Sequence, residues 1–504
     1  MLRKIRVAAA IVAFSLVTLL FLDFTGTIQA WFGFMAKIQF LPAILAMNVI
    51  VVLGLLLLTL LVGRVYCSVI CPMGVFQDIV SWISAKRKGK KARFGYSPEK
   101  KVLRYAVLAV FVVLMLVGLN EIAILIAPYS AYGRIANTLL APIWAMGNNI
   151  LASLAERADS YAFYTTDVWM KGLPTLIIAV VTLAVVSVLA WRNGRTWCNT
   201  ICPVGTILGF ASRYAIFRPV IDTNKCKDCG LCAKKCKAAA IDFKNHSIDY
   251  SRCVDCFDCL ENCNSKAIDI KSRLKEKSTA SESAEAQQNC QSQNVDAGRR
   301  GFLIGAGLLA AGVAKAQKDK KVDGGLATII DKKVPERQTP ILPAGSWTAE
   351  HFAQHCTGCQ LCVSACPNGV LRPSSNLNTL MQPHMEYDRG YCRPECTRCS
   401  EVCPTGAIKP ITKAEKSSIK IGTAVWHKQN CVVLTDGVEC GNCARHCTNG
   451  AIVMVPSDPK NPESHMIPTI NTERCIGCGA CENLCPSRPY SAIHVEGTEQ
   501  QREI

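Results

Sequence analysis

The spacing of the cysteines constrains this chain more than any other feature of its sequence. Of its 29 cysteines, 24 fall into six groups of four. Four groups share the spacing C-x2-C-x2-C-x3-C: Cys226, Cys229, Cys232, Cys236; Cys253, Cys256, Cys259, Cys263; Cys356, Cys359, Cys362, Cys366; and Cys475, Cys478, Cys481, Cys485. Two groups have a longer first gap: Cys392, Cys396, Cys399, Cys403; and Cys431, Cys440, Cys443, Cys447. Such groups predict six [4Fe–4S] clusters.

The spacing also predicts that the groups work in pairs. Three thiolates on one tight loop each bind one iron of a cubane, whereas the fourth cysteine points away and serves the neighbouring cluster. In the first pair we expect Cys263 to complete the cluster of Cys226, Cys229 and Cys232. Cys236 then completes the cluster of Cys253, Cys256 and Cys259. Zinc and disulfides are the alternatives. A zinc site uses two separated cysteine pairs, and cysteines three apart on a tight loop are poorly placed to bridge one another.

A short apolar segment follows every cysteine group. These segments are 238–243, 265–270, 369–374, 406–411, 450–455 and 491–495. Their alternation of apolar and polar residues predicts a strand after each cluster loop. The chain would thus repeat one unit of loop plus strand six times.

Four long apolar runs, at residues 7–24, 42–62, 102–127 and 173–191, lie in the first half of this 504-residue chain. Each is close to the ~20 residues that a helix needs to cross a bilayer. The basic residues that flank them predict a cytoplasmic position for both ends of the four-helix unit; these are Arg3, Lys4, Arg6, Lys86, Arg87, Lys88, Lys90, Lys91, Arg93, Lys100 and Lys101. Much of the net charge of +18 lies beside these runs. We therefore expect contact with anionic membrane lipid and no binding of nucleic acid.

The middle of the chain carries a second kind of signal. Residues 272–297 are polar and serine- and glutamine-rich, which predicts a disordered linker, with Cys290 as a free thiol. Residues 298–317 then combine two arginines, an apolar run and Ala314-Lys315-Ala316. This segment resembles a twin-arginine export signal inside the chain, although a short buried helix is the alternative. Export would place the following domain in the periplasm.

We therefore expect a membrane α-helical region, a four-helix anchor, combined with α+β ferredoxin-like domains that bind [4Fe–4S] clusters. The expected domains are the membrane domain at 1–215, a cytoplasmic two-cluster domain at 216–271 and a four-cluster domain at 318–504, with the linker and signal between them.

These motifs resemble two families of ferredoxins. Residues 1–271 are similar to the NapH family of membrane ferredoxins of periplasmic nitrate reductase systems, and residues 298–504 are similar to the NapG family. The resemblance implies a fusion of the two in the bacterial inner membrane. It further implies a quinol dehydrogenase that takes electrons from menaquinol and passes them to a periplasmic reductase or cytochrome. For the four-cluster domain it suggests that the first motif pairs with the fourth and the second with the third. Pairing of neighbouring motifs fits the sequence equally well.

Two further elements read Cys-x3-Cys-Pro, in "GRVYCSVICPMG" at 63–74 and "GRTWCNTICPVG" at 194–205. If the helix continues, Cys67 and Cys71 share one face, and so do Cys198 and Cys202. Their equivalent positions suggest a pseudo-twofold arrangement of four thiols. These thiols could hold a further cluster, act as two redox dithiols, or have a structural role.

Haem is not expected. No histidine precedes His246, and no C-x-x-C-H motif is present, so neither a paired-histidine haem in the membrane part nor a covalently attached haem is predicted. We expect an electron-transfer subunit whose catalytic residues the sequence does not identify. Asp23, Asn120 and Glu121 are candidates for assisting quinol deprotonation. The alternative function is a maturation or maintenance factor that supplies electrons for the assembly of a partner metalloenzyme.

Overall fold

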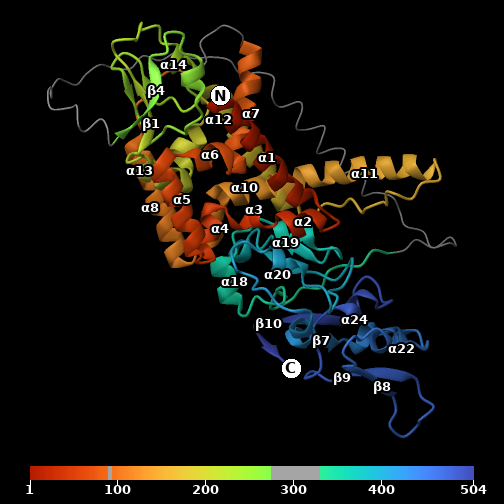
Figure 1. Ribbon diagram of the computed structural model, residues 1–504. Helices are drawn as coiled ribbons and strands as arrows, with labels where there is room; N and C mark the ends of the chain where they lie inside the picture. The colour runs from red at the N-terminus through yellow and green to blue at the C-terminus, as the bar shows by residue number, and fades with distance from the viewer. Residues whose placement is uncertain (89–93, 274–329) are drawn as a thin grey trace.

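The structure is a computed structural model that describes residues 1–88, 94–273 and 330–504. The expected linker, the twin-arginine-like segment and Cys290 lie outside these residues. Helices fill the first part of the chain, and two regions of short strands and cysteine loops follow it (Figure 1).

The helical region extends from the N-terminus to residue 212. Its helices are α1 (Leu2–Leu22), α2 (Thr27–Phe32), α3 (Phe34–Lys37), α4 (Phe40–Leu45), α5 (Val49–Val62), α6 (Val65–Val69), α7 (Pro72–Lys88), α8 (Lys101–Val117), α9 (Asn120–Ile126), α10 (Pro128–Ile135), α11 (Ala141–Glu156), α12 (Leu173–Asn193) and α13 (Pro203–Ser212). Two π-helical turns, Ala136–Leu140 and Trp197–Ile201, join α10 to α11 and precede α13. Pro72 and Pro203 each begin a helix directly after a cysteine, where the missing N–H costs nothing.

Among the residues that the structure describes, three helical segments are long and apolar enough to cross a membrane: Leu2–Leu22, Pro128–Glu156 and Leu173–Asn193. The first and last coincide with two of the four predicted spans. The predicted spans at 42–62 and 102–127 are interrupted instead. Asn48 caps α5, its side chain accepting a hydrogen bond from the Val51 N–H, and Gly118 ends α8 in the left-handed conformation. These breaks leave helices of 14 and 17 residues.

The first ferredoxin region, which we call module 1, comprises residues 217–273. Its elements are β1 (Phe217–Ile221), α14 (Leu231–Lys235), β2 (Ile241–Asp242), β3 (Ser247–Ile248), α15 (Asp258–Glu261) and β4 (Ile268–Ser272). Antiparallel pairing joins β1 to β4 and β2 to β3.

The second region, module 2, comprises residues 330–504. Its helices are α18 (Ala349–His355), α19 (Leu361–Ala365), α20 (Arg398–Val402), α21 (Lys413–Ser418), α22 (Val432–Thr435), α23 (Asn442–Arg445) and α24 (Ala480–Asn483), and two 3₁₀ turns lie at Leu377–Thr379 and Lys428–Asn430. Its strands are β5 (Leu371–Pro373), β6 (Pro383–Met385), β7 (Ile419–Trp426), β8 (Ile452–Pro456), β9 (Met466–Ile470) and β10 (Ile493–Glu503). The strands pair as β5 with β6, β7 with β10 and β8 with β9, all antiparallel.

Five of the six predicted strands after cysteine groups are present, as β2, β4, β5, β8 and β10. The prediction was wrong for residues 406–411, which form no strand. The Lys409 N–H bonds the Gly345 carbonyl and not a neighbouring strand.

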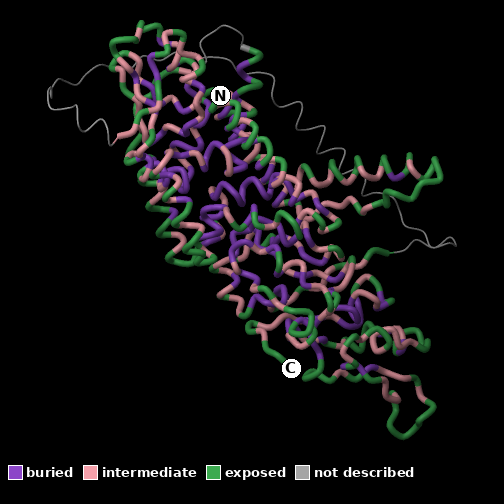
Figure 2. The backbone as a smooth tube through the Cα atoms, viewed as in Figure 1, coloured by how far each residue is buried: buried purple, intermediate pink, exposed green. Residues whose placement is uncertain are grey.

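The two modules lie at opposite ends of the helical region (Figure 1). At the start of α1, Arg3 contacts Asp258 of module 1, and at its end the helix contacts α19 of module 2. Buried residues run continuously from one module through the helices to the other, whereas α11 projects outward and is largely exposed (Figure 2).

Candidate functional site

Cysteine cages form the core of both modules. Three small cavities are each lined by four cysteines, three from one motif and the fourth from its neighbour. They are lined by Cys253, Cys256, Cys259 and Cys236; by Cys392, Cys396, Cys399 and Cys366; and by Cys475, Cys478, Cys481 and Cys447. The first cage contains the four cysteines that the sequence assigned to one cluster.

Two further sets in module 2 are brought together in the same way. Cys362 interacts electrostatically with Cys356, Cys359 and Cys403. Cys443 interacts with Cys431, Cys440 and Cys485. In module 2 the structure therefore pairs neighbouring motifs, not the first with the fourth as the resemblance suggested.

In the remaining set, that of the first motif in module 1, electrostatic contacts join three of the four expected cysteines. Cys232 interacts with Cys226 and Cys229. The sulfur of the expected fourth ligand, Cys263, lies near the Ser265 hydroxyl and the Ala267 N–H.

In three motifs the fourth cysteine sits in the same kind of turn. The N–H groups of Ala240, Ala267 and Ala451 donate to the sulfurs of Cys236, Cys263 and Cys447 at 3.5, 3.3 and 3.1 Å. The Lys416 ammonium also donates to the Cys392 sulfur at 3.2 Å. Such donors stabilise negative charge on sulfur and tune a cluster.

The geometry fits cubane clusters better than the alternatives. Across the described ranges every cysteine is free, so no disulfide closes these loops. A single tetrahedral zinc with Zn–S of about 2.3 Å needs four sulfurs within about 4 Å of one another. In the part of the chain that the structure describes, no three cysteine sulfurs lie within 4.8 Å of one another. Burial raises the pKa of Cys359 and Cys443 to about 11, so these thiols keep their protons unless a metal replaces them.

The Cys-x3-Cys-Pro elements meet where the helical region contacts module 1. Cys67, Cys71, Cys198 and Cys202 are all buried. Gly63 and Gly194, which open the two elements, both have positive φ. A Cβ at these positions would overlap the Asp255 carboxylate and the Lys237 carbonyl, so both contacts with module 1 require glycine.

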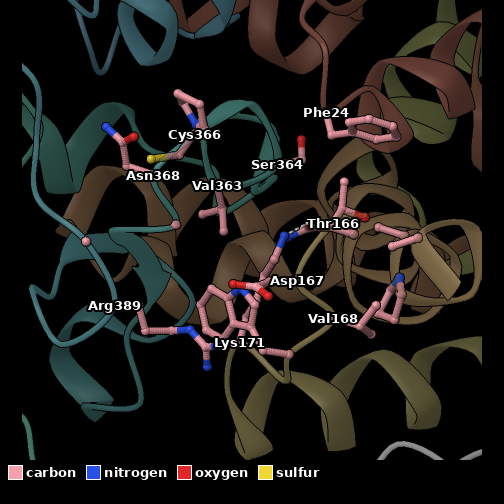
Figure 3. Close-up of a pocket in the computed structure, with 18 of the residues that line it drawn as sticks. Phe24, Thr166, Asp167, Val168, Lys171, Val363, Ser364, Cys366, Asn368 and Arg389 are labelled. Atoms are coloured by element: carbon pink, nitrogen blue, oxygen red, sulfur yellow. Dashed lines mark hydrogen bonds between the residues drawn. The ribbon is translucent and has the colours of Figure 1, made fainter. Parts of the chain in front are cut away.

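A cavity of about 730 Å³ lies between the helical region and module 2 (Figure 3). Its volume is within the range of small-molecule sites. Figure 3 shows side chains from both regions around this space: Phe24, Thr166, Asp167, Val168 and Lys171 from the helical region, and Val363, Ser364, Cys366, Asn368 and Arg389 from module 2. Cys366 also lines the cage of Cys392, Cys396 and Cys399. The cavity is therefore directly next to one cluster cage.

Charged and aromatic groups organise the wall of this cavity. The guanidinium groups of Arg372 and Arg389 lie 4.8 and 4.9 Å from the Trp169 ring centroid. Lys171 donates to the Asn137 side chain at 2.6 Å. Burial lowers the pKa of Lys171 to about 8.

The three polar residues considered for quinol deprotonation have different positions. Asp23 lines the cavity, but its carboxylate accepts hydrogen bonds from the N–H groups of Thr25, Gly26 and Gln29 and so holds the turn after α1. Asn120 donates to the carbonyls of Ala353 and Gln354 in module 2. Glu121 is not among the residues that line the cavity.

Sequence reasoning missed the buried arginines Arg64, Arg104, Arg134 and Arg195, all at most 1% exposed. Their neighbours come from distant parts of the chain, so no local pattern marks them. The repeated Gly-Arg that opens both Cys-x3-Cys-Pro elements was the one available signal. The cavity was missed as well, although aromatic residues gather in the segment 161–169.

Two family models match parts of the chain. One, described as a 4Fe-4S binding domain, matches residues 44–91 and 173–222. The other, described as a 4Fe-4S dicluster domain, matches residues 355–407 and 438–488. No solved structure matches.

Curated relatives match about a third of the chain. The ferredoxin-type protein NapF of Escherichia coli is 29% identical over 177 residues, which is 35% of this chain and 96% of NapF. The methylamine utilization ferredoxin-type protein MauM of Methylophilus methylotrophus is 29% identical over 163 residues, 31% of this chain and 71% of MauM. The putative electron transport protein YccM of Escherichia coli is 23% identical over 199 residues, 39% of this chain and 47% of YccM.

The cages, the matching models and these relatives agree. The chain is a ferredoxin-type electron-transfer protein that carries multiple [4Fe–4S] clusters.

Proposed function

We propose that this protein is a quinol dehydrogenase of the bacterial inner membrane, combining NapH-type and NapG-type parts. A four-helix anchor holds module 1 on the cytoplasmic side and module 2 on the periplasmic side. Six [4Fe–4S] clusters carry the electrons, and a periplasmic reductase or cytochrome receives them. Menaquinol is the donor.

The observation that supports this proposal most is the cavity beside Cys366. A quinol in the cavity would lie next to the cluster of Cys366, Cys392, Cys396 and Cys399. Phe24, Tyr164 and Trp169 provide aromatic surface for its ring. Apolar residues of α1 and α11, among them Leu22 and Trp144, also line the cavity, which suits a lipid-soluble substrate.

The reaction balances as two single-electron steps. Oxidation of a quinol to a quinone releases two electrons and two protons. Each cluster accepts one electron, so two clusters are reduced in succession for each quinol. The protons leave to the water-exposed side of the cavity, where Asp167 is exposed.

The places where the helices contact module 1 and module 2 support this arrangement of the modules on opposite sides of the membrane. The chain passes between the modules at α1, at α5, at α8 and α9, and at α12. Arg104 in α8 donates to the Ser251 carbonyl of module 1, and Asn120 in α9 bonds module 2. Arg195, just after α12, bonds the Lys237 carbonyl through its N–H, and Gly172, just before α12, lies beside Pro373.

Filling the cavity tests the proposal. Ser364 is one of the residues that line the cavity and is not a cysteine ligand, so Ser364→Trp should block quinol without removing a cluster. Anaerobic addition of a menaquinol analogue to purified protein should reduce the clusters, and EPR monitors this reduction over time. We expect the rate to fall at least tenfold in this variant.

Ser417→Trp, on the exposed face of α21, is the matched control and should reduce as fast as the wild type. Dithionite should reduce the same number of clusters in all three proteins. A wild-type protein that menaquinol does not reduce, or a Ser364→Trp variant that reacts at the wild-type rate, contradicts the proposal.

A further inference from the structure

The two Cys-x3-Cys-Pro elements form one buried site with four thiols. Cys67 lies in α6 and Cys198 in the π-helical turn Trp197–Ile201, while Cys71 and Cys202 lie just before the prolines that begin α7 and α13. All four cysteines are at most 4% exposed. None of them belongs to the six groups that the modules use.

A pseudo-twofold relation joins the elements through their arginines. The Arg64 side chain of the first element donates to the Cys198 carbonyl of the second at 3.3 Å. The Arg195 side chain of the second donates to the Cys67 carbonyl of the first at 2.6 Å. Each arginine thus fixes the cysteine backbone of the other element, and the four thiols are held as one set.

The separation of the sulfurs suits a multi-iron centre. Each of the four thiols is close enough to the other three to interact with them electrostatically. Yet no three sulfurs of the described chain come within 4.8 Å, and all four cysteines are free. The set is therefore too open for one tetrahedral ion and contains no disulfide.

Donors already surround the sulfurs. The Gln77 side-chain amide donates to Cys198 at 3.1 Å, and the Gly205 N–H donates to Cys202 at 3.3 Å. The Arg64 guanidinium lies 3.8 Å from the Cys67 sulfur. These groups stabilise thiolates more than thiols.

The buried charge of Arg64 also favours thiolates at this site. Arg64 is fully buried, and a buried guanidinium is costly unless an anion accompanies it. Arg195 has Asp78 as its partner, at 2.8 Å. Within the described residues no carboxylate lies in ion-pair contact with the Arg64 guanidinium, and its Nε has no hydrogen-bond acceptor. The Asp255 carboxylate bonds the Arg64 backbone N–H and not its guanidinium, and thiolates at this site would give the guanidinium an anionic partner.

We propose that Cys67, Cys71, Cys198 and Cys202 bind a further [4Fe–4S] cluster, in addition to those of the two modules. Binding takes one proton from each thiol, and the cluster with four thiolates carries about two negative charges when oxidised. The negative charges of the cluster would then lie beside the positive charges of Arg64 and Arg195. The residues matched by the 4Fe-4S binding domain model contain these four cysteines and none of the six groups.

The cluster occupies a defined place beside module 1. Arg64 donates through its backbone N–H to the Asp255 carboxylate at 2.8 Å, and Arg195 donates to the Lys237 carbonyl at 2.9 Å. Asp255 lies between Cys253 and Cys256, and Lys237 follows Cys236. The cage of Cys236, Cys253, Cys256 and Cys259 is thus the nearest electron partner of the new cluster.

Metal analysis tests this directly. We expect Cys67→Ser/Cys198→Ser to lose about four iron and four sulfide per chain, because this pair removes one ligand from each element. Cys290→Ser, at a cysteine outside every motif, is the matched control and should lose none. EPR signals of the reduced module clusters should remain.

An unchanged iron count in a variant that keeps the module signals contradicts the proposal, and a loss of two iron contradicts a cubane. If the variant does not fold, anomalous diffraction at the iron edge from wild-type crystals decides. A peak among the four sulfurs supports the cluster, and its absence contradicts it. Neither measurement uses quinol, so this result is separate from the test of the cavity.

Discussion

The two modules contact the helices in opposite ways. At module 1 the contact is made by charges: Asp78 in α7 pairs with Arg6, Arg195 and Lys237, and Arg64 and Arg104 reach module 1 backbone. At module 2 the direct hydrogen bonds join neutral groups, although the Arg372 and Arg389 guanidinium groups of module 2 also pack against Trp169 of the helical region. Asn120 donates to two backbone carbonyls, and Asn137 donates to the Gln360 side chain at 3.0 Å.

The difference separates a fixed junction from one with room for a ligand. Buried ion pairs demand close geometry, because an unmatched charge is costly. Amide hydrogen bonds contribute about 1 kcal/mol each and cost less when rearranged. The large cavity lies at the neutral contact, and the buried thiol set lies at the charged one.

The largest effect is expected at Asp78. Asp78→Ala leaves three cations without their shared carboxylate, and we expect it to lower the free energy of unfolding by about 3–5 kcal/mol. Chemical denaturation in detergent measures this. Asp78→Asn, which keeps the shape, should have an intermediate effect. Equal stability of Asp78→Ala and the wild type would show that the charged junction is not what holds module 1.

The pKa of Asp78 predicts how the stability of the charged junction changes with pH. Burial opposes ionisation of Asp78, but Arg195, Lys237 and Arg6 outweigh it and hold its pKa well below the usual range. Because the folded pKa is depressed, this stabilisation is present above about pH 4. It should be lost only as the pH falls through the folded pKa, in strong acid.

A smaller effect is expected at the neutral contact. Asn120→Ala removes the donor of two hydrogen bonds and should cost about 1–2 kcal/mol. Hydrogen exchange should become faster in α18, which ends at His355 and contains both acceptor carbonyls. Exchange in module 1 should not change. Faster exchange in both modules would mean that the two contacts are not independent.

The smallest effect is expected at the rim of the charged junction. Arg3 pairs with Asp258 at 2.7 Å and with Glu261, but its side chain is 42% exposed. Exposed pairs contribute about 0–1 kcal/mol and are screened by salt. Arg3→Ala should therefore change stability by less than 1 kcal/mol, and the difference should vanish at high salt. A salt-independent loss of several kcal/mol would contradict this.

The sequence was most informative where ligands are close together in the chain. The spacing within each motif predicted three cysteines per cage, and in the cage of Cys253, Cys256 and Cys259 also the fourth, Cys236. Pairing within module 2 depends on contacts between motifs, and the spacing left it open. Asn48 and Gly118 interrupt two apolar runs by ordinary capping and turn chemistry, which a count of apolar residues overlooks.

Long-range contacts explain the rest of what the sequence did not reveal. Arg64 and Asn199 are 135 residues apart, yet their side chains meet at 2.9 Å. The cavity combines the loop before α12 with module 2, which is nearly 200 residues further along the chain. Neither pairing has a local pattern.

The exchange of arginines between the two Cys-x3-Cys-Pro elements has a consequence for biosynthesis. When only residues 63–74 have left the ribosome, the first element cannot reach its final structure. Its Cys67 carbonyl accepts a hydrogen bond from Arg195, which has not yet been synthesised. The second element has no such delay, since Arg64 is already available when Cys198 is made. Both halves of the helical region must therefore be synthesised before either pair of thiols reaches its final position.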